Sequence, residues 1–163
     1  MPGQFESQKV KEVVASLESD DHDVRRKAVR EVKNAIIGSK VKKARYSNAG
    51  AVEKLVSIIQ NQPCQSELII DTLAALGSFG TSEQGMNFIL CTGAIQPVCH
   101  LLSDTMDAKT EAAAARVLRI FFQSEMIPPR DVLSILPSRD RGGPPSDRRA
   151  AWERLVDMLW AGA

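Results

Sequence analysis

The stretch Asn48–Gly80 decides the fold of this chain. It reads N-A-G-A-V-E-K-L-V-S-I-I-Q-N-Q-P-C-Q-S-E-L-I-I-D-T-L-A-A-L-G-S-F-G. Apolar residues recur at helical spacing on both sides of a break at Asn61–Pro63, which predicts two short helices with one apolar face each. Neither helix buries that face alone, and the pair still leaves apolar surface uncovered. The unit therefore needs neighbours of the same kind.

The same unit returns on both sides of this stretch. G-A-V at Gly50–Val52 returns as G-A-I at Gly93–Ile95, 43 residues later, and counting 42 residues back from Lys54–Ile59 gives Glu12–Leu17. The helices that follow share one apolar pattern over Asp23–Ile36, Glu67–Gly80 and Lys109–Phe122. Self-similarity at this period is typical of helical solenoids.

A third, shorter helix is predicted before each G-A-[VI], over roughly Ser39–Asn48 and Ser82–Thr92. Three helices per repeat favour the armadillo type over HEAT. The sequence thus predicts an all-α, right-handed armadillo (ARM/HEAT-like) solenoid of about three repeats. The array is expected over residues 1–123, divided at about 1–38, 39–80 and 81–123. Gly50 and Gly93 suit the sharp corners, because glycine tolerates backbone angles that other residues avoid.

The periodicity stops near Ser124. Residues 124–146 form a linker rich in Pro, Gly and charge, and residues 147–163 predict a last amphipathic helix or tail with Trp152, Leu155, Val156 and Leu159 as its stripe. We interpret this tail as lying outside the repeat. It is either a cap folded back over the open end, or a disordered or foreign C-terminus produced by truncation or altered splicing.

Length and charge set broad limits. The chain of 163 residues has the size of one domain, with a formal net charge of +1 and 5% aromatic residues. Residues 1–46 contain eleven Lys/Arg against seven Asp/Glu, whereas residues 47–127 contain four against eight. The basic cluster Lys40, Lys42, Lys43 and Arg45 is either a solvated helix face or a nucleic-acid surface. No interleaved aromatic residues support the nucleic-acid alternative.

The cysteines indicate a reducing compartment. Cys64, Cys91 and Cys99 are odd in number and lie among apolar helical residues, which favours buried thiols over a disulfide framework. The N-terminus has no apolar run typical of a secretory signal, and no stretch has the length of a membrane span. We therefore expect a cytoplasmic and/or nuclear protein.

The residues of an active site are not recognisable in the sequence. Of its two histidines, His22 is expected in solvent beside a helix cap, and His100 at a flanking position of a helix. Cys91, Cys99 and His100 do not have the spacing of zinc-finger ligands. There is no phosphate-binding loop of the G-x-x-x-x-G-K-[ST] type and no H-E-x-x-H. The sequence predicts a protein that is not an enzyme and has no cofactor, metal or small-molecule substrate.

Helical geometry selects the side of each third helix that faces away from the core. This side is expected to line the concave face of the solenoid, which suits partner segments. It comprises Lys27, Arg30, Glu31 and Asn34, then Asp71, Ala74, Ala75 and Ser78, then Ala113, Arg116, Val117 and Ile120. From these we select Lys27, Arg30, Asn34, Asp71, Ser78 and Arg116 as candidate protein-binding residues.

The chain resembles the armadillo family. In armadillo peptide receptors such as importin-alpha, an asparagine of each third helix clamps a peptide backbone, and a tryptophan four residues earlier forms pockets for basic side chains. Asn34 matches that asparagine, whereas Arg30 and Arg116 stand at tryptophan places, where they would repel a basic peptide. Ser78 and Ile120 also depart from the asparagine pattern.

A more specific resemblance covers about residues 20–122. The run Val32–Gly38 (V-K-N-A-I-I-G), with K-K-A at Lys42–Ala44 and L-G-S at Leu76–Ser78, is similar to the first repeats of the armadillo repeat-containing protein eight family, the armadillo subunits of the GID/CTLH ubiquitin ligases. The resemblance implies a non-catalytic scaffold for proteasomal degradation that helps hold a substrate receptor to the ligase core. Residues 124–163 do not continue the family pattern.

Three functions follow in order. The first is a protein–protein interaction scaffold of this ligase type, with ligase-core subunits as partners. The second is a generic armadillo adaptor that binds an extended peptide in its concave groove. The third is a nucleic-acid-binding helical repeat, which rests on the Lys40–Arg45 cluster alone. No membrane partner is expected.

Overall fold

The computed structural model describes residues 2–61, 66–104 and 107–123. The predicted linker 124–146 and tail 147–163 lie outside the described residues. The described residues form eight helices: α1 (Pro2–Ser16), α2 (His22–Ile36), α3 (Lys40–Asn48), α4 (Ala51–Asn61), α5 (Ser66–Gly80), α6 (Glu83–Thr92), α7 (Ile95–Asp104) and α8 (Ala108–Phe122). The predicted all-α solenoid of the armadillo type is confirmed.

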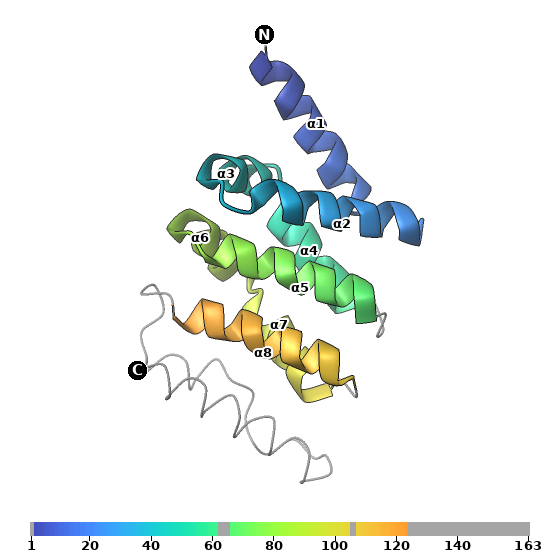
Figure 1. The fold of residues 1–163 in the computed structure, drawn as a ribbon, viewed down its shortest axis with the longest axis vertical. Coiled ribbons are helices and arrows are strands. Elements are labelled where there is room, and N and C mark those ends of the chain that lie inside the picture. Colours follow the sequence, from blue (N-terminus) through green and yellow to red (C-terminus); the bar gives the residue numbers. More distant parts are fainter. Residues whose placement is uncertain (1, 62–65, 105–106, 124–163) are drawn as a thin grey trace.

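The helices repeat in the predicted order. A short first helix (α3, α6), a second helix (α4, α7) and a long third helix (α5, α8) follow one another twice, preceded by the pair α1 and α2. Figure 1 shows the third helices α2, α5 and α8 side by side in one row, with α4 and α7 behind them. The row brings residues about 40 positions apart in sequence next to each other.

Local chemistry explains the helix starts. Asp21 caps α2 by accepting hydrogen bonds from two backbone N–H groups, at 2.9 and 3.3 Å. Ser39 and Ser82 cap the short helices α3 and α6 in the same way, and Asp107 caps α8. Each cap satisfies a donor that the first helical turn leaves without a partner.

The corners between helices use glycine where the prediction placed it. Gly50 and Gly93 have φ angles of 88° and 68°, in the left-handed region that residues with a Cβ rarely enter. These corners turn each first helix into its second helix. The helix after the corner can then pack against the third helix of its own repeat.

One continuous core runs through the row. The central helix α5 packs against α2 on one side and α8 on the other. Its Leu68, Leu73, Leu76 and Phe79 are fully buried, as the apolar spacing predicted. Val24, at the start of α2, is an apolar residue outside this core, because its side chain is 42% exposed.

Candidate protein-binding surface

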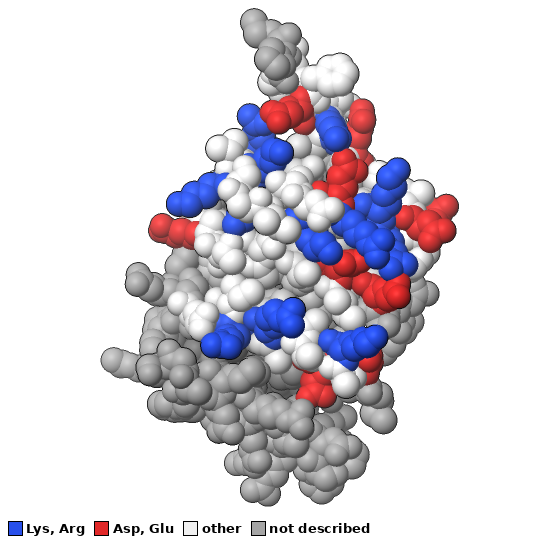
Figure 2. Space-filling view, in the orientation of Figure 1, with Lys and Arg blue, Asp and Glu red and all other residues white. Residues whose placement is uncertain are grey.

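The row of third helices forms the face on which the candidate residues lie. We call it the α2–α5–α8 face. Figure 2 shows this face with a mixed group of acidic and basic side chains over α2 and α5, and a separate, mainly basic set of side chains over α8. Uncharged residues lie between the two groups. The face is therefore divided into a charge-paired part and a basic part.

Asp71 is the centre of the paired part. Its carboxylate accepts hydrogen bonds from Arg30 Nε at 3.0 Å and from Lys33 Nζ at 2.9 Å, so that α5 is joined to α2. Partial burial alone would raise the pKa of Asp71, but the hydrogen bonds from Lys33 and Arg30 outweigh it and hold the pKa below its usual value. Arg26 of α2 pairs in the same way with Glu67 of α5.

A groove of about 590 Å³ opens where α2 meets α1 and α3. Lys27, Arg30 and Asn34 all line it, together with Tyr46 and side chains from α1. Tyr46 is 4% exposed, and burial, with the nearby Glu31 carboxylate, raises its pKa. The structure thus brings three of the six predicted residues into one hollow whose lining is mainly cationic and polar.

The carboxylates of this groove already have cationic partners. Glu31 pairs with Lys9 at 3.3 Å, and Glu6 pairs with Arg45. Lys27 is exposed and forms no hydrogen bond or ion pair with a described residue. The groove is therefore electropositive, and it suits an anionic rather than a basic segment.

Helix α8 carries the basic part of the face. Arg116 and Arg119 are exposed and lie one turn apart, and neither forms an ion pair with a residue that the structure describes. These places correspond to Arg30 and Lys33 of α2, which are paired. The two arginines of α8 remain available to a carboxylate from outside the described array.

Packing between the third helices alters the exposed side that we predicted. Ala75 is 0% exposed and Val117 is 3% exposed, so both are buried although they lie on this side of their helices. Val117 Cγ2 and Ile120 Cδ1 approach Gly77 of α5 so closely that a Cβ there would lie 3.5 and 3.2 Å from them. Ser78 is half-buried, outside the groove that Lys27, Arg30 and Asn34 share.

The basic cluster at residues 40–45 does not form one continuous surface. Lys43 is 8% exposed, and its Nζ donates a hydrogen bond to Thr81 Oγ1 at 2.6 Å. Burial, followed by the charge of Lys40, lowers the pKa of Lys43. Arg45 is directed to Glu6 of α1. The cluster therefore does not present four parallel cations to a phosphate backbone, which disfavours the nucleic-acid alternative.

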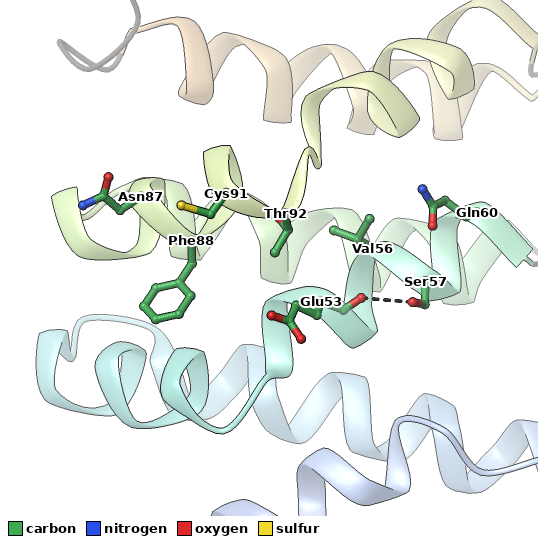
Figure 3. Close-up of a pocket in the computed structure, with 8 residues that line it drawn as sticks. All are labelled: Glu53, Val56, Ser57, Gln60, Asn87, Phe88, Cys91 and Thr92. Carbon is green, nitrogen blue, oxygen red and sulfur yellow. Dashed lines mark hydrogen bonds between the residues drawn. The ribbon is translucent and has the colours of Figure 1, made fainter.

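A second hollow, which the sequence did not indicate, lies between α4 and α6. Its volume is about 680 Å³, and its lining combines Val56 and Phe88 with polar side chains. Figure 3 shows Glu53 of α4 on the side of Phe88 and Thr92 of α6, and the Ser57 hydroxyl donates a hydrogen bond to the Glu53 carbonyl oxygen. Each helix contributes one face, with lining residues three or four positions apart, so no continuous motif marks the hollow in the sequence.

Two cysteines differ sharply in environment. Cys91 is exposed in this second hollow, whereas Cys99 of α7 is buried, and burial raises the pKa of the Cys99 thiol to about 12. Cys64 lies outside the described residues. Across residues 2–61, 66–104 and 107–123 no three His, Cys, Asp or Glu side chains gather as metal ligands would. In the same ranges, no helix combines the length and apolar character needed to cross a bilayer.

Comparison with known proteins supports the fold. The sequence matches no family model and no curated protein. A designed armadillo repeat protein superposes with a TM-score of 0.62 at 20% identity, over 68% of this chain and 46% of that one. Computationally designed armadillo repeat proteins for modular peptide recognition give a TM-score of 0.66 at 17% identity, over 91% of this chain and 63% of that one.

A third structure is described as bound to a peptide. It is a designed armadillo repeat protein in complex with the peptide (KR)4, with a TM-score of 0.68 at 17% identity over 95% of this chain and 66% of that one. The chain spans from about half to two thirds of the length of these structures. The similarity shows that the fold is that of an armadillo-repeat solenoid.

Proposed function

We propose that this chain is a non-catalytic scaffold of a GID/CTLH-type ubiquitin ligase, and that the α2–α5–α8 face and its α1–α2 groove receive a partner protein. A cytoplasmic or nuclear location accompanies this role. The proposal combines the armadillo fold with the resemblance over Val32–Gly38. One observation carries it: two residues of that run, Asn34 and Ile37, are exposed at the surface.

The burial of the run separates packing residues from surface residues. Val32 and Ile36 are fully buried, and Gly38 has a φ of 71° that ends α2, so the fold itself explains these residues. Asn34 is exposed in the groove, and Ile37 is 60% exposed although it is apolar. In this proposal, Asn34 and Ile37 supply a polar and an apolar contact to the partner.

The partner is tested with the full chain as bait. Purified GID/CTLH core subunits are mixed with the folded chain, and the complex is detected by size-exclusion chromatography. Asn34→Ala and Ile37→Asp are expected to weaken capture, whereas Lys11→Glu, on the exposed side of α1, is expected to leave it unchanged. Absence of any complex with a folded bait would refute the ligase role.

A generic armadillo adaptor is the second candidate, and the charge of the face favours it independently. Lys27, Arg116 and Arg119 are exposed, and none forms an ion pair with a residue that the structure describes. Such a face would attract an acidic peptide and repel a (KR)4-type peptide. The expected ligand is therefore an extended acidic segment.

Fluorescence anisotropy with labelled acidic and basic peptides tests the second candidate. The acidic peptide should bind more tightly, and added salt should weaken it. Arg116→Glu together with Arg119→Glu should reduce the affinity, and Lys11→Glu serves as the charge-matched control. Equal affinity for both peptides, or no effect of the double reversal, would exclude the basic part of the face as the binding site.

A further inference from the structure

The hollow between α4 and α6 contains one charged side chain among its described lining residues. Glu53 is the only Asp, Glu, Lys or Arg of that lining, and the other side chains are apolar or neutral and polar. No described lining residue belongs to α2, α5 or α8, so the hollow is separate from the α2–α5–α8 face. Its volume of about 680 Å³ gives room for a long side chain and for the backbone that carries it.

The carboxylate of Glu53 is available to a ligand. Glu53 is exposed and forms no ion pair with a residue that the structure describes. The adjacent cation, Lys54, is directed to Glu18 instead, with its Nζ 3.0 Å from a carboxylate oxygen. Oε2 of Glu53 lies above the corner glycine Gly50, where an added Cβ would be 3.9 Å from it. The hollow is therefore locally electronegative and attracts a cation.

The two hydroxyl groups of the hollow are oriented as acceptors. Ser57 Oγ donates its proton to the backbone carbonyl oxygen of Glu53 at 3.1 Å, and Thr92 Oγ1 donates to that of Ile89 at 3.0 Å. A hydroxyl has one proton and two lone pairs, so the lone pairs of both oxygens remain for a donor from outside. Together with the carboxylate of Glu53, they favour a ligand that is rich in N–H donors.

The apolar part of the lining suits a planar cation on a long stem. Val56 is buried, Phe88 is half-buried, and Figure 3 shows the Glu53 carboxylate on the side of the Phe88 ring. A guanidinium group stacks on an aromatic ring and presents its N–H donors to acceptors around its edge. The methylene stem of an arginine packs on apolar surface while its charged end stays polar.

We propose that the α4–α6 hollow binds an arginine side chain of a partner protein. The guanidinium stacks on Phe88 and pairs with the carboxylate of Glu53, and the stem lies over Val56. The hydroxyls of Ser57 and Thr92 accept hydrogen bonds from the same segment. This site is distinct from the α2–α5–α8 face, which suits an acidic partner, so the chain offers two segments of opposite charge separate places.

An NMR titration of the isotope-labelled full chain tests the proposal, with acetyl-glycyl-arginyl-glycinamide as the probe. We expect saturable shifts that are largest for the amides of residues 53–60 and 87–92, which contain the described lining. The matched peptide with citrulline has nearly the same shape without the charge, and it should bind several-fold more weakly. The lysine peptide should also bind several-fold more weakly, because an ammonium group is not planar and does not stack.

Three variants assign the interaction to its residues. Glu53→Gln removes the charge of the site and should weaken the arginine peptide several-fold. Phe88→Leu keeps an apolar side chain without the ring and should also weaken it. Glu83→Gln is the control, because Glu83 is an exposed carboxylate of α6 outside the described lining, and its binding should equal that of the parent. The amide spectrum of each variant shows directly whether it is folded.

Four results would overturn the proposal. Shifts that fall outside the hollow would exclude it as the site, and equal binding of the arginine and citrulline peptides would exclude a role for charge. Equal binding of the arginine and lysine peptides would exclude recognition of the guanidinium. Equal losses in Glu53→Gln and Glu83→Gln would mean attraction to acidic residues in general. None of these results bears on the ligase proposal, which concerns the α2–α5–α8 face.

Discussion

Glycine-to-alanine substitutions at three buried places should destabilise the solenoid in a graded order that follows the space at each glycine. At Gly77, an added Cβ would lie 3.2 Å from Ile120 Cδ1, the flexible end of a side chain. At Gly80, it would lie 2.9 Å from two ring atoms of Phe121, which is fully buried. At Gly85, it would lie 2.0 Å from the backbone carbonyl oxygen of Phe79.

The magnitudes combine two opposing effects. Alanine favours a helix over glycine by about 0.8–1.0 kcal/mol. Overpacking a core costs about 1–3 kcal/mol and occasionally more. Gly77→Ala should therefore stay within about 1 kcal/mol of the parent, and Gly80→Ala should lose about 1–2 kcal/mol. Gly85→Ala should lose about 3 kcal/mol or more, because the backbone of α5 cannot move without disturbing its contacts with α6.

The free energies of unfolding of the three variants are measured by urea unfolding, followed by far-UV circular dichroism. They can be compared when the variants have equal m-values, the slopes of unfolding free energy against urea concentration. The expected order of the free energy of unfolding is Gly77→Ala above Gly80→Ala above Gly85→Ala. A Gly85→Ala variant as stable as the parent would show that α5 and α6 do not approach each other as described. A reversed order of Gly77 and Gly80 would refute the packing of α5 on α8.

Three further predictions concern charge, thiols and caps. Asp71→Asn should lower the free energy of unfolding at pH 7 by about 1 kcal/mol. Because the folded-state pKa of Asp71 is depressed, the stability from its ion pairs should be present above about pH 4 and be lost as the pH falls through that folded-state pKa. Parallel plots of unfolding free energy against pH for variant and parent would contradict this. Iodoacetamide should label the exposed Cys91 in the folded chain. It should label the buried Cys99, whose pKa is raised to about 12, only after unfolding. Equal labelling rates of the two thiols, followed by mass spectrometry, would refute the exposed and buried environments described for them. Asp21→Ala should lower the free energy of unfolding by about 1 kcal/mol through loss of the α2 cap. Asp21→Ser keeps a capping oxygen and should leave the free energy of unfolding unchanged, which tests the capping mechanism.

Much of the candidate site was predictable because it depends on helical periodicity. The spacing of buried residues in α2 placed Lys27, Arg30 and Asn34 on one side of the helix, and the structure brings all three to one groove. The same reasoning failed for Ala75 and Val117, which lie on that side yet are buried. Periodicity gives the angle of a side chain around its own helix, but not how far a neighbouring helix covers it.

The sequence by itself determined the repeat, the order of short, second and third helices, their caps and the glycine corners, because these depend on residues within a few positions of each other and on self-similarity. Only the tertiary structure decided which charges meet. Asp71 lies 41 residues from Arg30 and 38 from Lys33, and Lys43 lies 38 from Thr81. Whether such side chains touch depends on the distance and inclination between packed helices, which no local pattern encodes.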